Sequence, residues 1–183
     1  MDGYSRYNTE SVAIPVLRFL RTLFSEPDEE LFQFVIGKQT ELRSIGVQID
    51  DSLTLDQMQA EYTRLFLGPA DHHPPYQSVF TEGTYWGVDA NEVNQFMKQY
   101  GLSKVQTNTM PPDHAAMIFE LLEKILKSDL PNKLTVYNDF MSKHTKWLLD
   151  FLLEIIGISR LQIYKSGFSF TRVFLKEELN SIP

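Results

Sequence analysis

Residues 61–80 read EYTRLFLGPADHHPPYQSVF, a helical pattern that runs directly into a proline-rich segment. Apolar residues up to Phe66 lie at helical spacing, and Gly68-Pro69 stops that pattern. The next two prolines fix the backbone angle φ and remove hydrogen-bond donors, so the chain favours an extended path as far as Tyr76. The stretch therefore predicts a helix that delivers the chain to a proline-rich, aromatic loop over residues 67–88.

Helical spacing continues on both sides of this stretch, with capping patterns at several starts. We expect residues 134–156 to form one long central helix that ends at Gly157. A last helix is expected over 161–179, although Gly167 and the β-favouring residues after it have low helix propensity. No alternating strand pattern appears elsewhere, so the fold class is all-α, a single compact domain over residues 1–183 with six to seven or more helices. The predicted helices cover 12–24, 28–46, 54–67, 89–101, 111–128, 134–156 and 161–179.

The composition is that of a folded protein without thiol chemistry. Of 183 residues, 43% are hydrophobic and 13% aromatic, enough to build a core without cross-links. Cysteine is absent, which excludes disulfides, iron–sulfur clusters and cysteine nucleophiles. No apolar run approaches the roughly 20 residues of a membrane span, and the N-terminus lacks a signal-peptide pattern. We therefore expect a cytoplasmic protein without membrane insertion.

The charge and the missing motifs exclude several function classes. A formal charge of −7 argues against nucleic acid as a partner, because phosphate binding requires clustered Lys and Arg. The charge favours basic partners, although it also serves simply to keep a protein in solution. Neither GxGxxG nor GxxxxGK followed by Ser or Thr occurs, so no nucleotide cofactor is expected.

The histidines and aspartates of the sequence allow two kinds of hydrolase site to be considered. Together Asp71, His72, Asp113 and His114 could hold a metal ion for a hydrolase. No HExxH or ExxH spacing supports that site, so no metal is expected. Ser78 with His114 does not make a serine hydrolase, because no Gly-x-Ser-x-Gly turn surrounds the serine. Asp113 also has a structural explanation, since a carboxylate in the first turn of the helix predicted from residue 111 caps backbone donors.

Aromatic side chains in the loop allow two interpretations. They could fold down as a lid on the core, or they could form a groove for an apolar, positively charged peptide with the help of nearby carboxylates. His144, by contrast, lies on the apolar stripe of the long helix, which favours a hydrogen-bonded core histidine. The rings and carboxylates concerned are Tyr76, Phe80, Tyr85 and Trp86 with Glu82 and Asp89.

Two patches of the sequence resemble the TorD/DmsD/NarJ family of redox-enzyme maturation chaperones. Tyr62-x-Arg64-Leu65-Phe66-x-Gly68-Pro69, followed by Pro74-Pro75-Tyr76-x-Ser78-Val79-Phe80, is similar to the first family signature. Pro112-Asp113-His114 at a helix start is similar to the second. One departure is Met110, where many members have a glutamate. The motif residues with structural roles would be Tyr62, Arg64, Phe66, Gly68, Pro69, Pro75 and Pro112.

The resemblance implies an all-helical, cytoplasmic, non-enzymatic chaperone, monomeric or dimeric, for a molybdenum-cofactor enzyme. Its partners would be the twin-arginine leader and the catalytic subunit of that enzyme, held back from export until assembly is complete. Asp113 would face arginine, while His114 would orient Asp113 or tune binding near neutral pH. The alternatives are the metal-dependent hydrolase above, or an interaction module that binds a folded partner and no leader. The peptide contacts carried over are Tyr76, Ser78, Phe80, Trp86, Asp113 and His114.

If the second patch folds against the first, residues 75–76 form one wall of a peptide groove and residues 113–114 form the other. The two patches are far apart in the sequence, so this meeting is a specific expectation of the resemblance.

Overall fold

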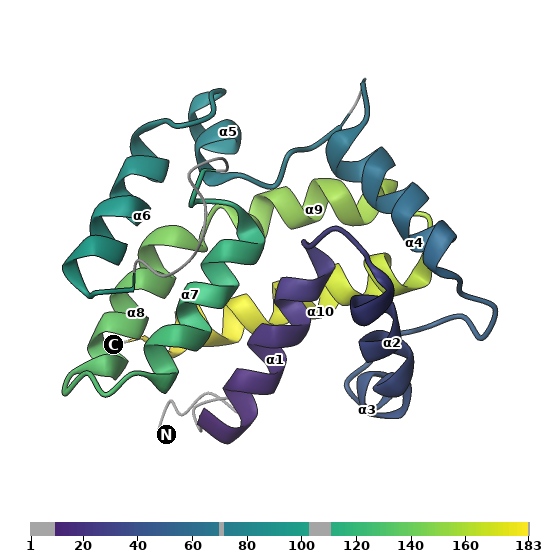
Figure 1. The fold of residues 1–183 in the computed structure, drawn as a ribbon, viewed down its shortest axis with the longest axis horizontal. Coiled ribbons are helices and arrows are strands. Elements are labelled where there is room, and N and C mark those ends of the chain that lie inside the picture. Colours follow the sequence, from purple (N-terminus) through teal and green to yellow (C-terminus); the bar gives the residue numbers. More distant parts are fainter. Residues whose placement is uncertain (1–9, 70–71, 103–110, 183) are drawn as a thin grey trace.

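The computed structural model describes residues 10–69, 72–102 and 111–182, and helix is the only regular secondary structure within them (Figure 1). The all-α prediction is therefore confirmed. The helices are α1 (Glu10–Leu23), α2 (Glu29–Gly37), α3 (Gln39–Ser44), α4 (Leu55–Tyr62), the π-helical turn η1 (Thr63–Leu67), α5 (Gln77–Glu82), α6 (Val88–Gln99), α7 (Ala115–Lys127), α8 (Lys133–His144), α9 (Leu148–Ile158) and α10 (Gln162–Ser181).

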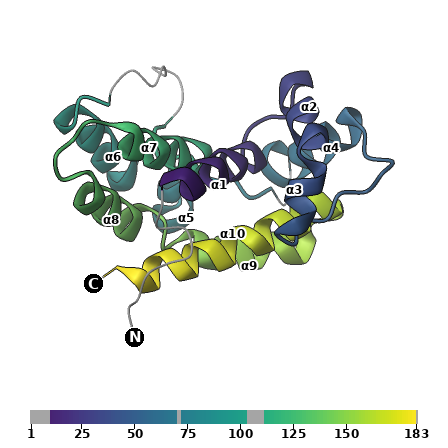
Figure 2. The same cartoon turned by 90° about the horizontal axis from the view of Figure 1, so that it is seen from below.

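Two groups of helices flank a central layer. Figures 1 and 2 both show α2–α4 at one end of the molecule and α6–α8 at the other, with α1 and α10 running between them. Helix α1 packs against α7, and α10 packs against α9. The central helices therefore hold the two ends in one body.

The core is organised around the ring of Phe24, which is fully buried directly after α1. Its centroid lies 5.4 Å from that of Phe168 and 5.9 Å from that of Phe119. The rings of Phe66 and Phe151 follow at 6.0 and 6.5 Å. Such aromatic pairs contribute about 0.5–1.5 kcal/mol each beyond the burial of area. One ring thus connects α1 to η1, α7, α9 and α10.

Gly167 allows α10 to approach Leu23 closely. A Cβ atom at residue 167 would lie only 2.9 Å from both methyl carbons of Leu23. The glycine therefore has a packing role, and α10 runs from Gln162 to Ser181 without interruption. The helix forms because its apolar stripe is buried against α1 and α9, which outweighs the local preference of the β-favouring residues.

The long central helix predicted over 134–156 is wrong, because two helices, α8 and α9, replace it. At the break, Thr145 Oγ1 donates to the Met141 carbonyl at 2.7 Å, and Trp147 Nε1 donates to the His144 carbonyl at 2.9 Å. The Met141 carbonyl also keeps its helical bond from the Thr145 N–H, whereas the N–H of Leu148 turns to the Thr145 carbonyl and the Trp147 indole satisfies the His144 carbonyl in its place. Gly157 lies inside α9 rather than after it. The helix predicted over 28–46 is likewise divided into α2 and α3 at Lys38.

Three other boundaries differ from the sequence prediction. Residues 77–82 form α5 inside the segment predicted as a loop. Helix α6 begins at Val88, so Asp89 lies in its first turn and is not its cap. Helix α7 begins at Ala115, four residues after the predicted start at 111. As a result, Gln77, Asp89 and Asp113 form hydrogen bonds between different segments of the chain, as described below.

Candidate functional site

The two sequence patches lie side by side. The backbone N–H of Gln77 donates to the Asp113 carbonyl at 3.1 Å, and the N–H of Ala115 donates to the Pro75 carbonyl at 2.8 Å. These bonds pair Tyr76 with His114 in an isolated antiparallel bridge. The two rings meet edge to face with centroids 4.7 Å apart. The structure therefore brings together the two segments that the sequence led us to expect as neighbours.

Asp113 caps α5 and not its own helix. The side chain is fully buried, and its Oδ2 accepts a hydrogen bond from the backbone N–H of Ser78 at 2.7 Å. Ser78 is the second residue of α5, so the carboxylate meets the positive end of that short helix. Among the described residues, Asp113 Oδ1 and the Ser78 hydroxyl have no hydrogen-bond partner. Both side chains are buried, and the bond from the Ser78 N–H to the Asp113 carboxylate fixes the start of α5.

His114 is the residue that caps α7. Its Nδ1 accepts a hydrogen bond from the backbone N–H of Ala116 at 3.2 Å. Burial lowers the pKa of His114 to about 4, so the ring is neutral near pH 7. In the described part of the chain the ring makes no hydrogen bond to Asp113. These facts correct our expectation that His114 orients Asp113 or changes charge near neutral pH.

Helix α5 is also held by a network centred on Gln77. The Gln77 amide donates to Asp89 Oδ1 at 2.9 Å, and its oxygen lies 3.0 Å from His144 Nδ1. Thr81 Oγ1 donates to the other Asp89 oxygen at 2.5 Å. His144 is buried in the core, as predicted. The network connects α5 to α6 and α8. It therefore holds the start of α5, directly after Tyr76, in a fixed position.

A groove of about 880 Å³ opens in front of the Tyr76–His114 bridge. Its walls come from the C-terminal half of α1, the turn into α2, η1, residues 74–76 and the first two turns of α7. Phe34, Leu67 and Tyr85 line this groove and are exposed to solvent. A pocket with exposed apolar side chains at its rim is typical of a binding site for an extended or helical peptide.

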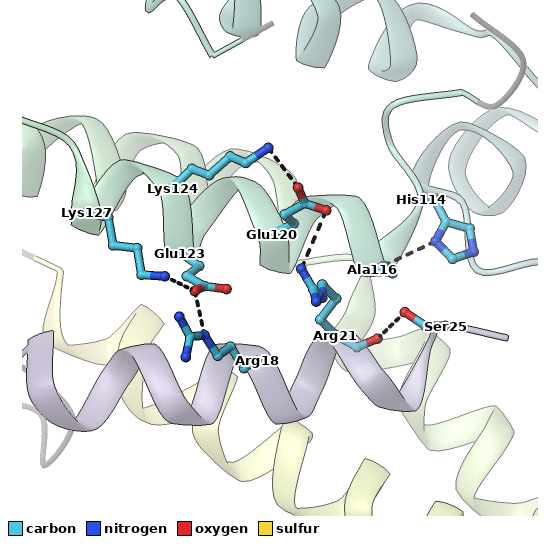
Figure 3. Close-up of polar contacts among 9 residues, drawn as sticks. All are labelled: Arg18, Arg21, Ser25, His114, Ala116, Glu120, Glu123, Lys124 and Lys127. Atoms are coloured by element: carbon cyan, nitrogen blue, oxygen red, sulfur yellow. Dashed lines mark hydrogen bonds and ion pairs between the residues drawn. The ribbon is translucent and has the colours of Figure 1, made fainter. Parts of the chain in front are cut away.

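Charged side chains from α1 and α7 form an ordered row along one wall (Figure 3). Arg18 Nε donates to Glu123 at 2.7 Å, and Lys127 contacts the same carboxylate oxygen. One turn nearer the bridge, Glu120 lies 2.7 Å from Lys124 and 3.8 Å from Arg21. Arg18, Arg21 and Glu120 also line the groove. Sequence reasoning missed this row, because the pairs between α1 and α7 join residues about a hundred positions apart.

The remaining predicted contacts lie outside the lining of the groove. Phe80 is exposed on α5, with its ring 5.7 Å from that of Trp147. Trp86 is exposed and has a positive φ of 61°, which is unusual for a residue with a large side chain. Glu82 braces this turn, since its carboxylate accepts from the N–H groups of Val88 and Asp89, both at 3.0 Å. Tyr85, next to Trp86, reaches the groove and packs against Tyr76 at 5.1 Å.

The motif residues also have structural contacts, and Tyr62, Phe66 and Pro75 line the groove as well. Tyr62 donates to the Phe24 carbonyl at 3.3 Å, and Arg64 forms a bidentate pair with Glu61 at 2.8 Å. Phe66 belongs to the core, and Pro75 and Pro112 are buried at the bridge. Gly68 is buried at the end of η1, and Pro69 is exposed.

The proposed hydrolase site receives no geometric support. In the described ranges, no group of three or more His, Asp or Glu side chains could hold a metal ion. Asp71 and Met110 lie outside the described residues. His114 Nδ1 already accepts a hydrogen bond, and Asp113 is fully buried.

No helix in the described ranges has both the length and the apolar character needed to span a membrane.

Comparison with known proteins agrees with the fold and with the sequence patches. One solved structure, described as a redox enzyme maturation protein from Archaeoglobus fulgidus, is 28% identical to the chain, with a TM-score of 0.67. The match covers 89% of this chain and 93% of that one. Among curated proteins, no sequence matches significantly. The family model for the nitrate reductase delta subunit matches residues 20–152. The chain therefore belongs to the nitrate reductase delta subunit family, and the resemblance to NarJ- and TorD-type chaperones is confirmed.

Proposed function

We propose that the chain is a cytoplasmic chaperone for the maturation of a redox enzyme, without catalytic activity of its own. Family membership and the likeness to a redox enzyme maturation protein support this class of function. We further propose that its client is a molybdenum-cofactor enzyme, bound through its twin-arginine leader before export. The groove in front of the Tyr76–His114 bridge is the site assigned to the leader.

The groove itself is the observation that carries this proposal. It combines exposed apolar side chains with four carboxylates, from Glu26, Asp28, Glu30 and Glu120, against two arginines, Arg18 and Arg21. A twin-arginine leader pairs two guanidinium groups with an apolar segment, so its receptor needs carboxylates beside an apolar surface. Both features line the same cavity here.

Burial divides the predicted contacts into two roles. Tyr76 and His114 line the groove and are assigned to direct contact with the peptide. Ser78 and Asp113 have no exposed surface, so they act by holding α5 and Tyr76 in place. Phe80 and Trp86 are exposed outside the lining of the groove and are proposed to contact the part of the client that leaves the groove.

Titration of the purified protein with a synthetic twin-arginine leader tests the proposal. We expect Tyr76→Ala to weaken binding by about 1–3 kcal/mol, a range typical of aromatic residues at the centre of an interface. Tyr100→Ala is the matched control, because Tyr100 is half-buried against Phe96 on α6 and does not line the groove.

Three results would contradict the proposal in different ways. Equal affinity for a leader with both arginines replaced by glutamine would exclude recognition of the arginines. Equal losses in the two tyrosine variants would exclude this groove. Binding of the folded client without any binding of the leader would favour an interaction module for a folded partner.

A further inference from the structure

Glu120 is the carboxylate of the groove best placed to bind a cation from a ligand. Its side chain is 25% exposed and lines the cavity. Glu123, one turn away, is only 8% exposed and already pairs with Arg18 and Lys127. Asp113 has no exposed surface. An ion pair at a half-buried position such as Glu120 is also screened less by water than one on the open turn at Glu26 and Glu30.

One side of the Glu120 carboxylate is only loosely occupied (Figure 3). Oε1 lies 2.7 Å from the Lys124 ammonium, which is a close ion pair on the same helix. Oε2 lies 3.8 Å from Arg21 Nη1, too far for a hydrogen bond. Arg18, by contrast, donates to Glu123 at 2.7 Å. Arg21 is therefore near Glu120 without being tightly bound to it.

We propose that Glu120 receives an arginine of the leader and that Arg21 is a built-in competitor for this carboxylate. This inference rests on the proposed function and names the residues that read the basic part of the peptide. An incoming guanidinium approaches Oε2 and displaces Arg21, whose side chain is 42% exposed and free to turn toward solvent. The exchange replaces a loose ion pair with a hydrogen-bonded one, so it favours binding.

The exchange also discriminates between basic peptides. Arginine presents a planar fork of donors that can hydrogen-bond Oε2 and a second acceptor at once, whereas the lysine ammonium is a strongly hydrated point charge. Lys124 already supplies such a point charge to Oε1. A lysine of the ligand would thus compete with Arg21 without offering a better geometry. We therefore assign preference for arginine over lysine to the Glu120–Arg21 pair.

Titration of three variants with paired-arginine and paired-lysine leaders tests the exchange. Arg21→Gln removes the competitor, and we expect it to tighten binding of the arginine leader about two- to fivefold, the value of a half-exposed ion pair. Glu120→Gln should weaken binding about tenfold and abolish the preference for arginine over lysine. Arg43→Gln is the matched control, with the same change of charge on α3 outside the groove, and should leave the preference unchanged.

The double variant of Arg21→Gln and Glu120→Gln isolates the coupling. We expect Arg21→Gln to have no effect once Glu120 is replaced. Weaker binding of the arginine leader by Arg21→Gln alone would overturn the inference, because Arg21 would then be a ligand-binding residue.

If the wild-type protein binds the leader and none of these variants changes its affinity, only this inference fails. If neither the wild type nor Arg21→Gln binds any leader, the proposed function fails with it. Glu120→Ala, which also removes the carboxylate, replaces Glu120→Gln if the latter lowers the melting temperature.

Discussion

Arg64 ties α4 and η1 to the C-terminal end of α9, and its removal should be costly. Its Nε and Nη2 donate to the two oxygens of Glu61, both at 2.8 Å, and Nη2 also donates to the Ile158 carbonyl at 2.8 Å. Glu61 additionally accepts from the backbone N–H of Arg160 at 2.6 Å. The carboxylate is 6% exposed, so it depends on these donors for the solvation that it loses.

The change Arg64→Met keeps the apolar stem of the side chain and removes three hydrogen bonds. Breaking a buried ion pair from one side costs about 3–5 kcal/mol, because the other charge stays buried. Arg64 is 29% exposed, and the Arg160 N–H remains, so we expect a loss of about 2–3 kcal/mol in the free energy of unfolding. In a domain of this size the loss corresponds to a melting temperature lower by roughly 4–12 °C.

Urea unfolding followed by circular dichroism measures this loss. The matched control is Arg43→Met, since Arg43 also pairs with a carboxylate, at 2.6 Å, and donates to a backbone carbonyl, at 2.7 Å. Its partner Asp51 is 87% exposed, so the control should lose much less stability than Arg64→Met. Equal losses in the two variants would refute the argument that burial of the carboxylate decides the cost.

Two further predictions concern Asp113 and the two buried histidines, His114 and His144. Asp113→Asn should weaken leader binding by about 1–2 kcal/mol without touching the peptide, and hydrogen exchange should show faster opening of α5 amides. Unchanged exchange would exclude its role as a cap. The pKa values of His114 and His144 are lowered to about 4 by burial, so the unfolded chain binds more protons below pH 6.5. Each histidine should therefore withdraw on the order of 3 kcal/mol of stability between pH 6.5 and 4, and unfolding measured at pH 7, 5.5 and 4.5 checks this. A flat profile would show that these rings are not held neutral.

Most helices could be predicted from the sequence, because their apolar stripes repeat every three or four residues and end in recognisable signals. The division between α8 and α9 could not, since the apolar rhythm continues through residues 145–147. At the break the N–H of Leu148 bonds to the Thr145 carbonyl and the Trp147 indole takes the His144 carbonyl, an exchange that local periodicity does not encode.

The candidate site was only partly predictable for a related reason. The motifs pointed to Tyr76 and His114, which do line the groove. They also pointed to Asp113 as a contact for arginine, because a carboxylate near a helix start resembles a cap or a ligand in sequence. Its burial, and its bond to a helix 35 residues away, follow from tertiary packing alone. Glu120 and Arg21 carried no local signal of their pairing.

The hydrogen bond at the start of α7 also fixes the proton of His114. Nδ1 accepts from the Ala116 N–H, so it carries a lone pair, and the proton of the neutral ring must reside on Nε2. The ring is then a hydrogen-bond donor to anything outside its own helix. A peptide carbonyl could accept a hydrogen bond from Nε2. A guanidinium group could not, because it has only donors and would face another donor. This tautomer directs the basic side chains of a bound peptide away from the bridge, and toward the carboxylates farther along the groove.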